Sequence, residues 1–377
     1  MAYNEMKSLD EYEQAARDYL DSKEPGLYEL KYRDAFKLRT LAEETNLEKY
    51  WILADEAEIH RLDDMHHTFT LVKGGKLHLA SLPPDTERIL DVACGTGIWA
   101  IQMAKEFPNA EIVGIDISPL QIQERLPPNV KVIKQDIEHD SWPFPEDYFD
   151  HVNISHVHGC IKDWPGLLRR ARKHLKPYGT LEVAEMDWSI VRSENGGASP
   201  AQSLWDKNML AAGKIRGRPF ALGPHLMRFF SQAGLVFNHE TVLKVPQKPY
   251  STDEQEKQIG AEWMLNGLAG YDAWTTKLFT QVLGWKLADV HKFVEEVKNE
   301  LRDGSTHTYF HLHVVTGSKR GPLHITDNSN DKLSTTNRIT RAFIPKDRIL
   351  SMFAFGNLML AFLLGILGAL VVTVFKR

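Results

Sequence analysis

Apolar residues in the middle of the chain form short runs, separated by amphipathic stretches with a helical period. The runs are rich in Val and Ile and end at glycine or polar residues, as is typical of buried strands. Strands are predicted at 88–93, 110–118, 130–137, 148–155 and 179–186, and helices at 98–107 and 167–176. Strands that alternate with helices predict an α/β fold, a doubly wound sheet of parallel strands joined by right-handed crossovers.

The flanking regions have a different rhythm. Residues 1–50 form a polar N-terminal segment of helical character, and the helical period continues through 51–80 until Pro83 and Pro84, which we expect to stop it. After Asp187 the alternation loosens. Further helices are predicted at 199–215, 225–235 and 252–303, and further strands at 236–245 and 306–317. These late helices are read as insertions into the sheet domain.

The C-terminal part of the chain predicts a membrane span. Residues 318–348 are polar and without periodicity, as in a flexible linker. Residues 349–375 contain no charged side chain, and 16 of these 27 are Leu, Ile, Val or Phe. About 20 such residues cross the hydrocarbon core of a bilayer as a helix. We therefore expect residues 349–375 to be a transmembrane helix.

Charges around this segment predict its orientation. The five basic residues that precede it are Lys332, Arg338, Arg341, Lys346 and Arg348. An excess of positive charge marks the cytosolic side of a span, so the catalytic domain is expected in the cytosol, tail-anchored to the endoplasmic reticulum or another organelle. Small residues recur every four positions at 361, 365 and 369, which allows two spans to pack closely as a homodimer.

Overall charge and cysteine content narrow the possible binding partners and the redox compartment of the protein. The net charge is −5, from 45 basic and 50 acidic residues, and no basic block stands out. Nucleic acid is therefore not an expected partner, because phosphate binding needs clustered Lys and Arg. The two cysteines offer no disulfide framework, which suits a reducing compartment.

The strongest chemical signal lies where the first predicted strand runs into a glycine-rich turn. Gly95 and Gly97 follow this strand and precede a helix, which lets a ligand approach the backbone closely at the carboxyl edge of the sheet. Asp91, near the end of the strand, is expected to face the cationic amino-acid end of the ligand. A carboxylate here disfavours a pyrophosphate.

Two more aspartates end the next two strands. Asp116 can accept hydrogen bonds from both ribose hydroxyls of an adenosine, and Asp136 can meet the adenine amine. Ile117 and Ile137, which follow them, belong to the same predicted site. An acidic lining suits a ligand that carries a sulfonium and an ammonium, and therefore predicts S-adenosylmethionine.

A nicotinamide-dependent oxidoreductase is the main alternative interpretation of the glycine motif. Gly95, Gly97 and Ala100 also fit the dinucleotide pattern G-x-G-x-x-A. The position of Asp91 and the acidic ends of the later strands favour the methyl donor.

These motifs resemble those of class I methyltransferases, and the resemblance is closer to the fungal LaeA-like methyltransferases of secondary metabolism. It spans about residues 48–317 through the segments DEAEIHRLDDMHH, ILDVACGTGIWA, IKDWPGLLRRARKHLKPYGTLEVAEMD, QIGAEWMLNGLAGYDAW and FTQVLGW. It implies a Rossmann-like, seven-stranded methyltransferase sheet over residues 51–317. It also implies a small-molecule acceptor, with a regulatory or protein-methylating role as the alternative. Ala93 departs from the family, which usually has glycine there, and we expect cofactor binding to survive the change.

Candidate catalytic residues follow the fourth and fifth strands. His156 and His158 lie where this fold usually meets its acceptor, and each is a candidate base or a structural donor. Glu185 is grouped with Glu182 on one face of the fifth strand, with Asp187 beyond. The atom that is methylated stays open.

Two further readings concern aromatic and histidine side chains. Trp263, Trp274 and Trp285 either line an apolar acceptor pocket or belong to the core. The adjacent His66 and His67, and the pair 311 and 313, lack a cysteine or carboxylate cluster at zinc-like spacing, so no metal site is predicted.

Overall fold

The computed structural model describes residues 56–118, 126–189 and 191–321. These residues fall within one compact unit. The predicted N-terminal segment 1–50, nearly all of the predicted linker and the predicted span 349–375 lie outside the described residues. No helix within the described ranges is both long and apolar enough to cross a membrane.

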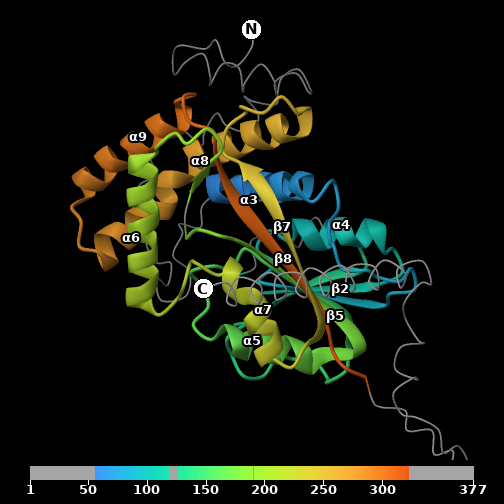
Figure 1. Ribbon diagram of the computed structural model, residues 1–377. Coiled ribbons are helices and arrows are strands. Elements are labelled where there is room, and N and C mark those ends of the chain that lie inside the picture. The colour runs from blue at the N-terminus through green and yellow to red at the C-terminus, as the bar shows by residue number, and fades with distance from the viewer. Residues whose placement is uncertain (1–55, 119–125, 190, 322–377) are drawn as a thin grey trace, which may run out of the picture. The chain divides into compact units, whose positions relative to one another are not determined.

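A twisted sheet forms the centre of the domain, and its strands follow the predicted positions (Figure 1). They are β1 (Arg88–Val92), β2 (Glu111–Asp116), β3 (Val130–Lys134), β4 (Phe149–Ser155), β5 (Leu175–Met186), β6 (Arg192–Ser193), β7 (Val236–Pro246) and β8 (Thr308–Ser318). The strands β3, β2, β1, β4 and β5 are parallel and adjacent in that order. The doubly wound α/β prediction is confirmed for this half.

The remaining strands are antiparallel, and they correct the predicted number of seven strands. β8 runs antiparallel to β5, and β7 runs antiparallel to β8 along its other edge. The two-residue β6 also pairs with β8, which makes the sheet eight-stranded. Antiparallel neighbours need no helical crossover, so the loss of strand–helix alternation after residue 187 is consistent with this arrangement.

Helices cover both faces of the parallel half. Alternate residues of β1 point to opposite faces: Ile89 packs with α4 (Ile98–Glu106), and Leu90 belongs to the core that includes α5 (Trp164–His174) and α7 (Leu226–Gln232). This two-sided burial is the reason that the strands read as continuous apolar runs.

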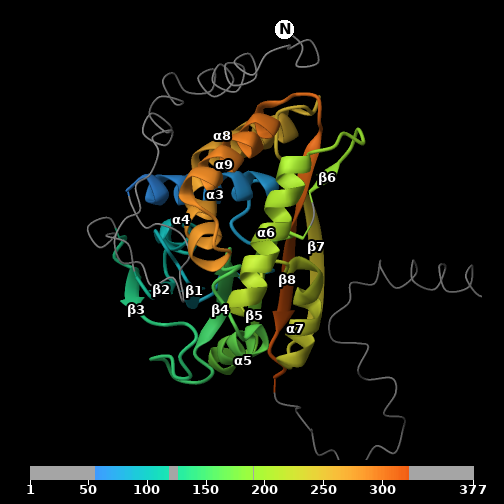
Figure 2. The same ribbon diagram turned by 90° about the vertical axis from the view of Figure 1, so that its left-hand side faces the viewer.

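A helical layer lies at the end of the sheet away from α5 and α7 (Figures 1 and 2). It consists of α3 (Glu56–Val72), α6 (Pro200–Arg216), α8 (Glu254–Lys277), a π-helical turn (Leu278–Val282) and α9 (Leu287–Arg302). α8 packs against both α3 and α9, which buries almost all of its side chains from Ile259 onward. The buried part of α8 includes polar side chains, such as Glu262 and Asn266, beside its apolar ones.

The end of α3 corrects another prediction. The helix stops at Val72, well before the two prolines at 83 and 84. Gly74 and Gly75 adopt left-handed conformations, with φ of 69° and 82°. The N–H of Gly75 donates to the carbonyl of Thr70 at 2.9 Å, so glycine rather than proline ends the helix.

A buried ion pair within α3 is hydrogen-bonded to α8. Nε of Arg61 donates to Glu58 at 2.8 Å, and its Nη1 donates to Oδ1 of Asn266 at 3.0 Å. Asn266 in turn donates to the main-chain carbonyl of Arg61 at 2.8 Å. All three side chains are at most 3% exposed. A charge at such a depth is tolerated only with its partner present.

We expect Arg61→Leu to lower the free energy of unfolding by about 3 kcal/mol, because Glu58 then keeps its charge in the core without this cation. The double variant Glu58→Leu/Arg61→Leu should recover part of that loss. Denaturant titration of the full-length protein measures both, with Lys131→Leu in the half-exposed Lys131–Glu111 pair as the control. Equal losses in the single and double variants would contradict the role of the pair.

Candidate cofactor and acceptor site

The loop between β1 and α4 has the backbone shape that its glycines predict. Gly95 and Gly97 have φ of 52° and 70°, and the N–H of Gly97 donates to the carbonyl of Cys94 at 2.8 Å. A Cβ placed on Gly95 would meet nothing within 4 Å, so the loop presents open space at this residue. A ligand can therefore lie directly against the main chain.

Ala93, where the family usually has glycine, also adopts a left-handed conformation, with φ of 60°. A residue with a Cβ pays about 1–2 kcal/mol in this region. Replacing glycine by alanine here therefore does more than add a methyl group, because the alanine backbone is strained in this turn.

Asp116 connects the loop to β2. Its Oδ2 accepts from the N–H of Gly95 at 3.0 Å, and its Oδ1 accepts from the N–H of Ser118 at 2.8 Å. Burial raises the pKa of this carboxyl, and the main-chain donors of Ser118, Gly95 and Ile117 partly offset the rise. Each carboxylate oxygen keeps acceptor capacity for a further hydrogen bond, and the contact with the ribose stays a prediction.

Asp91 is the more deeply buried carboxyl, at 4% exposure. The side-chain amide of Asn153, on the neighbouring β4, donates to its Oδ1 at 2.9 Å. Burial raises the pKa of Asp91 to about 7, with a further rise from Asp116 and an opposing effect of Asn153. A cationic ligand would stabilise the ionised form, so the site fits a sulfonium and ammonium donor and not a pyrophosphate.

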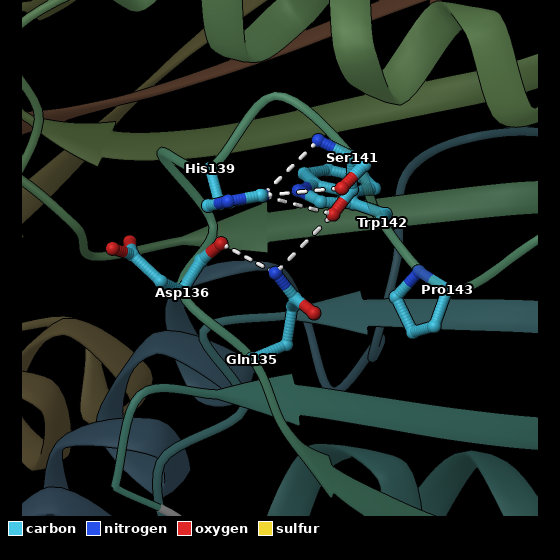
Figure 3. Close-up of a pocket in the computed structure, with 6 residues that line it drawn as sticks. All are labelled: Gln135, Asp136, His139, Ser141, Trp142 and Pro143. Atoms are coloured by element: carbon cyan, nitrogen blue, oxygen red, sulfur yellow. Dashed lines mark hydrogen bonds between the residues drawn. The ribbon is translucent and has the colours of Figure 1, made fainter.

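The third aspartate borders a hollow at the end of β3. A cavity of about 370 Å³ is lined by Gln135, Asp136, His139, Ser141, Trp142 and Pro143 (Figure 3). The Gln135 amide points to the main-chain oxygens of Asp136 and Ser141, while the Asp136 carboxylate points away from it. Oδ1 of Asp136 accepts from the N–H of Glu138, and the buried Ile137 follows. The contact of Asp136 with adenine therefore stays a prediction.

Helix α3 contacts the loop and α4 through side chains that were not identified from the sequence. The hydroxyl of Thr96 donates to Asp63, and Nε2 of His66 lies 2.8 Å from Oε1 of Gln102 on α4. These contacts are side chain to side chain between distant segments, so no local pattern marks them.

His156 follows β4 in a left-handed conformation, with φ of 57°. Its ring stacks on Phe69 of α3, with 4.0 Å between the ring centroids. Burial, together with nearby His158 and Lys73, holds its pKa well below the ordinary value, so the ring is neutral near pH 7. Its Nδ1 is buried and has no hydrogen-bond partner among the described residues.

His158 and Glu185 form a pair at the ends of β4 and β5. Nδ1 of His158 lies 2.9 Å from Oε2 of Glu185, whose Oε1 accepts from the N–H of Val157 at 2.7 Å. The carboxylate is fully buried. The carboxylate fixes the orientation of the His158 ring.

The grouping of Glu182 with Glu185 was wrong. Residues three apart in a strand point to opposite faces, and Glu182 accepts instead from the N–H groups of Leu79 and Ala80, both at 2.7 Å. Glu182 therefore anchors the segment after α3. Asp187 instead forms an ion pair with Arg192 at 2.9 Å.

The tryptophans predicted as pocket or core belong mainly to the core. Trp263 and Trp274 are at most 2% exposed and pack with Trp188. Trp285 is only partly buried and packs against this core. Trp188 also lies 5.4 Å from His158 between ring centroids, and the indole N–H groups of Trp188 and Trp263 are buried without a partner in the described part.

Comparison with known proteins agrees with this geometry. The sequence model of the family described as "Methyltransferase domain" matches residues 65–236. The chain is 34% identical over 278 residues to "Secondary metabolism regulator LAE1" of Cochliobolus heterostrophus, which covers 72% of this chain and 90% of that protein. The chain belongs to the LaeA-like methyltransferases.

A further relative supports this family. The LaeA-like chain is 34% identical over 269 residues to "Methyltransferase pytC" of Aspergillus terreus, covering 70% of this chain and 82% of that one. Among solved structures it resembles geranyl diphosphate C-methyltransferase from Streptomyces coelicolor at 15% identity. That match covers 82% of this chain and 98% of that chain, with a TM-score of 0.41.

The chain is thus an S-adenosylmethionine-dependent methyltransferase. The cofactor supplies a methyl group on a cationic sulfur. Asp91 would face its cationic end, Asp116 its ribose and Asp136 its adenine, while the backbone at Gly95 leaves room for close approach. The predictions for Ala93, Gly97, Ile117 and Ile137 remain predictions.

We expect Asp116→Ala to weaken S-adenosylmethionine binding by about 2 kcal/mol, or roughly 30-fold, because it removes a charged acceptor and releases the N–H of Gly95. Calorimetry on the full-length protein measures this, with Asp289→Ala, an exposed aspartate of α9, as the control. Tight binding of a nicotinamide dinucleotide and none of S-adenosylmethionine would contradict the cofactor assignment.

Proposed function

We propose that this LaeA-like enzyme methylates a small, apolar secondary metabolite at a hydroxyl or amine. The observation that carries the proposal is the His158–Glu185 pair at the carboxyl ends of β4 and β5. Residue Ile154, two positions before His156, pairs with Val92 at the start of the glycine loop, so the two histidines follow the strand beside the cofactor residues.

The pair fits an acceptor that must lose a proton before it attacks the methyl group. When Nδ1–H of His158 donates to Glu185, Nε2 carries the lone pair that can accept the proton of an O–H or N–H. The carboxylate stabilises the imidazolium that forms. A carbon or thiol acceptor would depend less on proton removal by His158.

The surroundings support an apolar acceptor. Phe69 stacks on His156, and Trp188 packs beside His158. Aromatic side chains around a few polar groups are typical of small-molecule sites. The name of the relative from Aspergillus terreus, a methyltransferase, is consistent with this reading.

A regulatory role, by methylating or binding a protein, is the second candidate. It is favoured by the printed name of the Cochliobolus heterostrophus relative, a secondary metabolism regulator. His158 is buried, and the partly buried His156 stacks on Phe69 of α3. Histidines covered in this way suit a small acceptor better than a side chain that projects from a folded protein.

We expect His158→Ala to abolish most of the methylation while cofactor affinity stays within about twofold, because His158 contacts the acceptor side only. The variant should fail to restore the methylated product in a deletion strain, where comparative metabolite profiling shows products lighter by one methyl group. His225→Ala, at an exposed position, should restore it. Full restoration by His158→Ala would show that the pair has only a packing role. A broad change in metabolite levels after deletion, with no product lighter by one methyl group, would favour the regulatory role.

We also propose that residues 349–375 hold the enzyme on a membrane with its catalytic domain in the cytosol. The support comes from the sequence: an uncharged stretch of 27 residues, preceded by five basic side chains. A membrane location would bring the enzyme to lipophilic acceptors.

A fluorescent tag at the N-terminus should mark a membrane and remain accessible to protease in sealed vesicles. A chain truncated at residue 330 should lose the membrane signal, because the uncharged stretch is removed. Protection of the N-terminal tag would contradict the orientation, and an unchanged membrane signal after truncation would contradict the anchor.

A further inference from the structure

We propose that His156, His158 and Glu185 form a binding site for a divalent transition-metal ion, to which the acceptor oxygen also binds. The part that concerns the acceptor rests on the proposed function. His156 and His158 lie two positions apart in the sequence, and Glu185 follows His158 by 27 positions. The pairing of β4 with β5 brings the three residues together. This revises the expectation, drawn from the sequence, that the chain has no metal site.

The geometry suits an ion. One ring nitrogen from each histidine and one carboxylate oxygen all lie within 4.8 Å of one another. Ligands about 2.0–2.2 Å from a metal are separated by about 3–3.5 Å, so the widest gap must close by roughly an ångström or more on binding. His158 and Glu185 already meet at 2.9 Å, so the remaining movement belongs to His156.

Two features of His156 are unfavourable in themselves and are explained by a ligand. Its Nδ1 is buried without a hydrogen-bond partner among the described residues. Its backbone adopts φ of 57°, a strained conformation for a residue with a Cβ. A bound ion would pair this nitrogen and offset both penalties.

Glu185 is oriented as metal-binding carboxylates usually are. Its Oε1 accepts from the N–H of Val157, which fixes the carboxylate plane and leaves Oε2 directed at the histidines. Its side chain is fully buried, so the carboxylate has little freedom to turn away.

The donor set selects the class of ion. Two imidazoles and one carboxylate favour zinc, cobalt, manganese or ferrous iron over magnesium and calcium, which prefer oxygen ligands. Three protein ligands leave coordination positions open, as in catalytic rather than structural sites. Within the part of the chain that the structure describes, no other group of three such side chains comes together.

The other histidines that stand close in the sequence have different partners. His66 contacts Gln102 on α4, and His67 lies 3.5 Å from Glu262. His313 lies 2.8 Å from Glu240. Each is accounted for by a protein side chain, whereas Nδ1 of His156 is not.

The ion would change how the acceptor is activated. With the ion bound, His158 serves as a ligand, and the ion lowers the pKa of a coordinated hydroxyl, whose proton passes to solvent. The resulting oxygen attacks the methyl carbon, the bond from carbon to sulfur breaks, and a methyl ether and S-adenosylhomocysteine form. Charge balances, because the anionic oxygen and the cationic sulfonium both become neutral.

The test measures metal binding directly, on the full-length, tag-free protein after chelation and dialysis. Titration with Co²⁺ should give visible absorption bands that saturate at one equivalent, and Zn²⁺ should displace them. His156→Ala and Glu185→Gln should each weaken Co²⁺ binding at least a hundredfold. Glu185→Gln keeps an acceptor for the N–H of Val157, and S-adenosylmethionine binding confirms that each variant is folded. His66→Ala and His225→Ala are the matched controls and should bind as the unaltered protein does.

Equal Co²⁺ binding by all variants, or no binding by the unaltered protein, would overturn the metal site. The proposed function is tested separately by turnover. Metal-free protein that methylates at the full rate would leave the His158–Glu185 pair as the activating group and would reject the role of the ion. Recovery of turnover by Zn²⁺ or Mn²⁺ in the unaltered protein, but not in His156→Ala, would support the role of the ion in activating the acceptor.

Discussion

The site depends on a carboxyl group that is buried where three parallel strands end. Asp91 lies beside Asp116 in a region of low dielectric, and its pKa rises to about 7 because burial penalises its charge. A neutral or anionic ligand would leave that penalty in place, whereas a sulfonium or ammonium offsets it. The surrounding contacts follow from this constraint. Asn153 holds Asp91 in position, and Asp116 uses its own oxygens to fix the loop at Gly95.

Helix α3 links the cofactor loop to the acceptor side. Its Asp63 accepts from Thr96 in the loop, and its Phe69 stacks on His156. The buried Arg61 pairs with Glu58 and Asn266, which ties the same helix to α8. A shift of α3 would therefore disturb the loop, the histidine and the helical layer together.

Local patterns predicted the sheet and the cofactor residues, because apolar runs mark buried strands and the three aspartates stand at their ends. Other features depend on contacts across the fold. Glycines 74 and 75, not the later prolines, end α3. The structure reveals this through the left-handed backbone of the two glycines. Glu182 and Glu185 were grouped by closeness in sequence, although a strand places them on opposite faces. His156, His158 and Glu185 were each named as catalytic candidates, but the sequence did not predict that they form one cluster, because the pairing of β4 with β5 brings them together.

The central claim, that a buried carboxyl and a cationic cofactor stabilise each other, is tested most directly by the pH dependence of S-adenosylmethionine affinity. Asp91 is protonated below its pKa of about 7 and then offers no charge to the sulfonium. The association constant should fall about tenfold between pH 8 and pH 6, and Asp91→Asn should remove this decline. An association constant that is unchanged over this range in the unaltered protein, or a decline that persists in Asp91→Asn, would contradict the account.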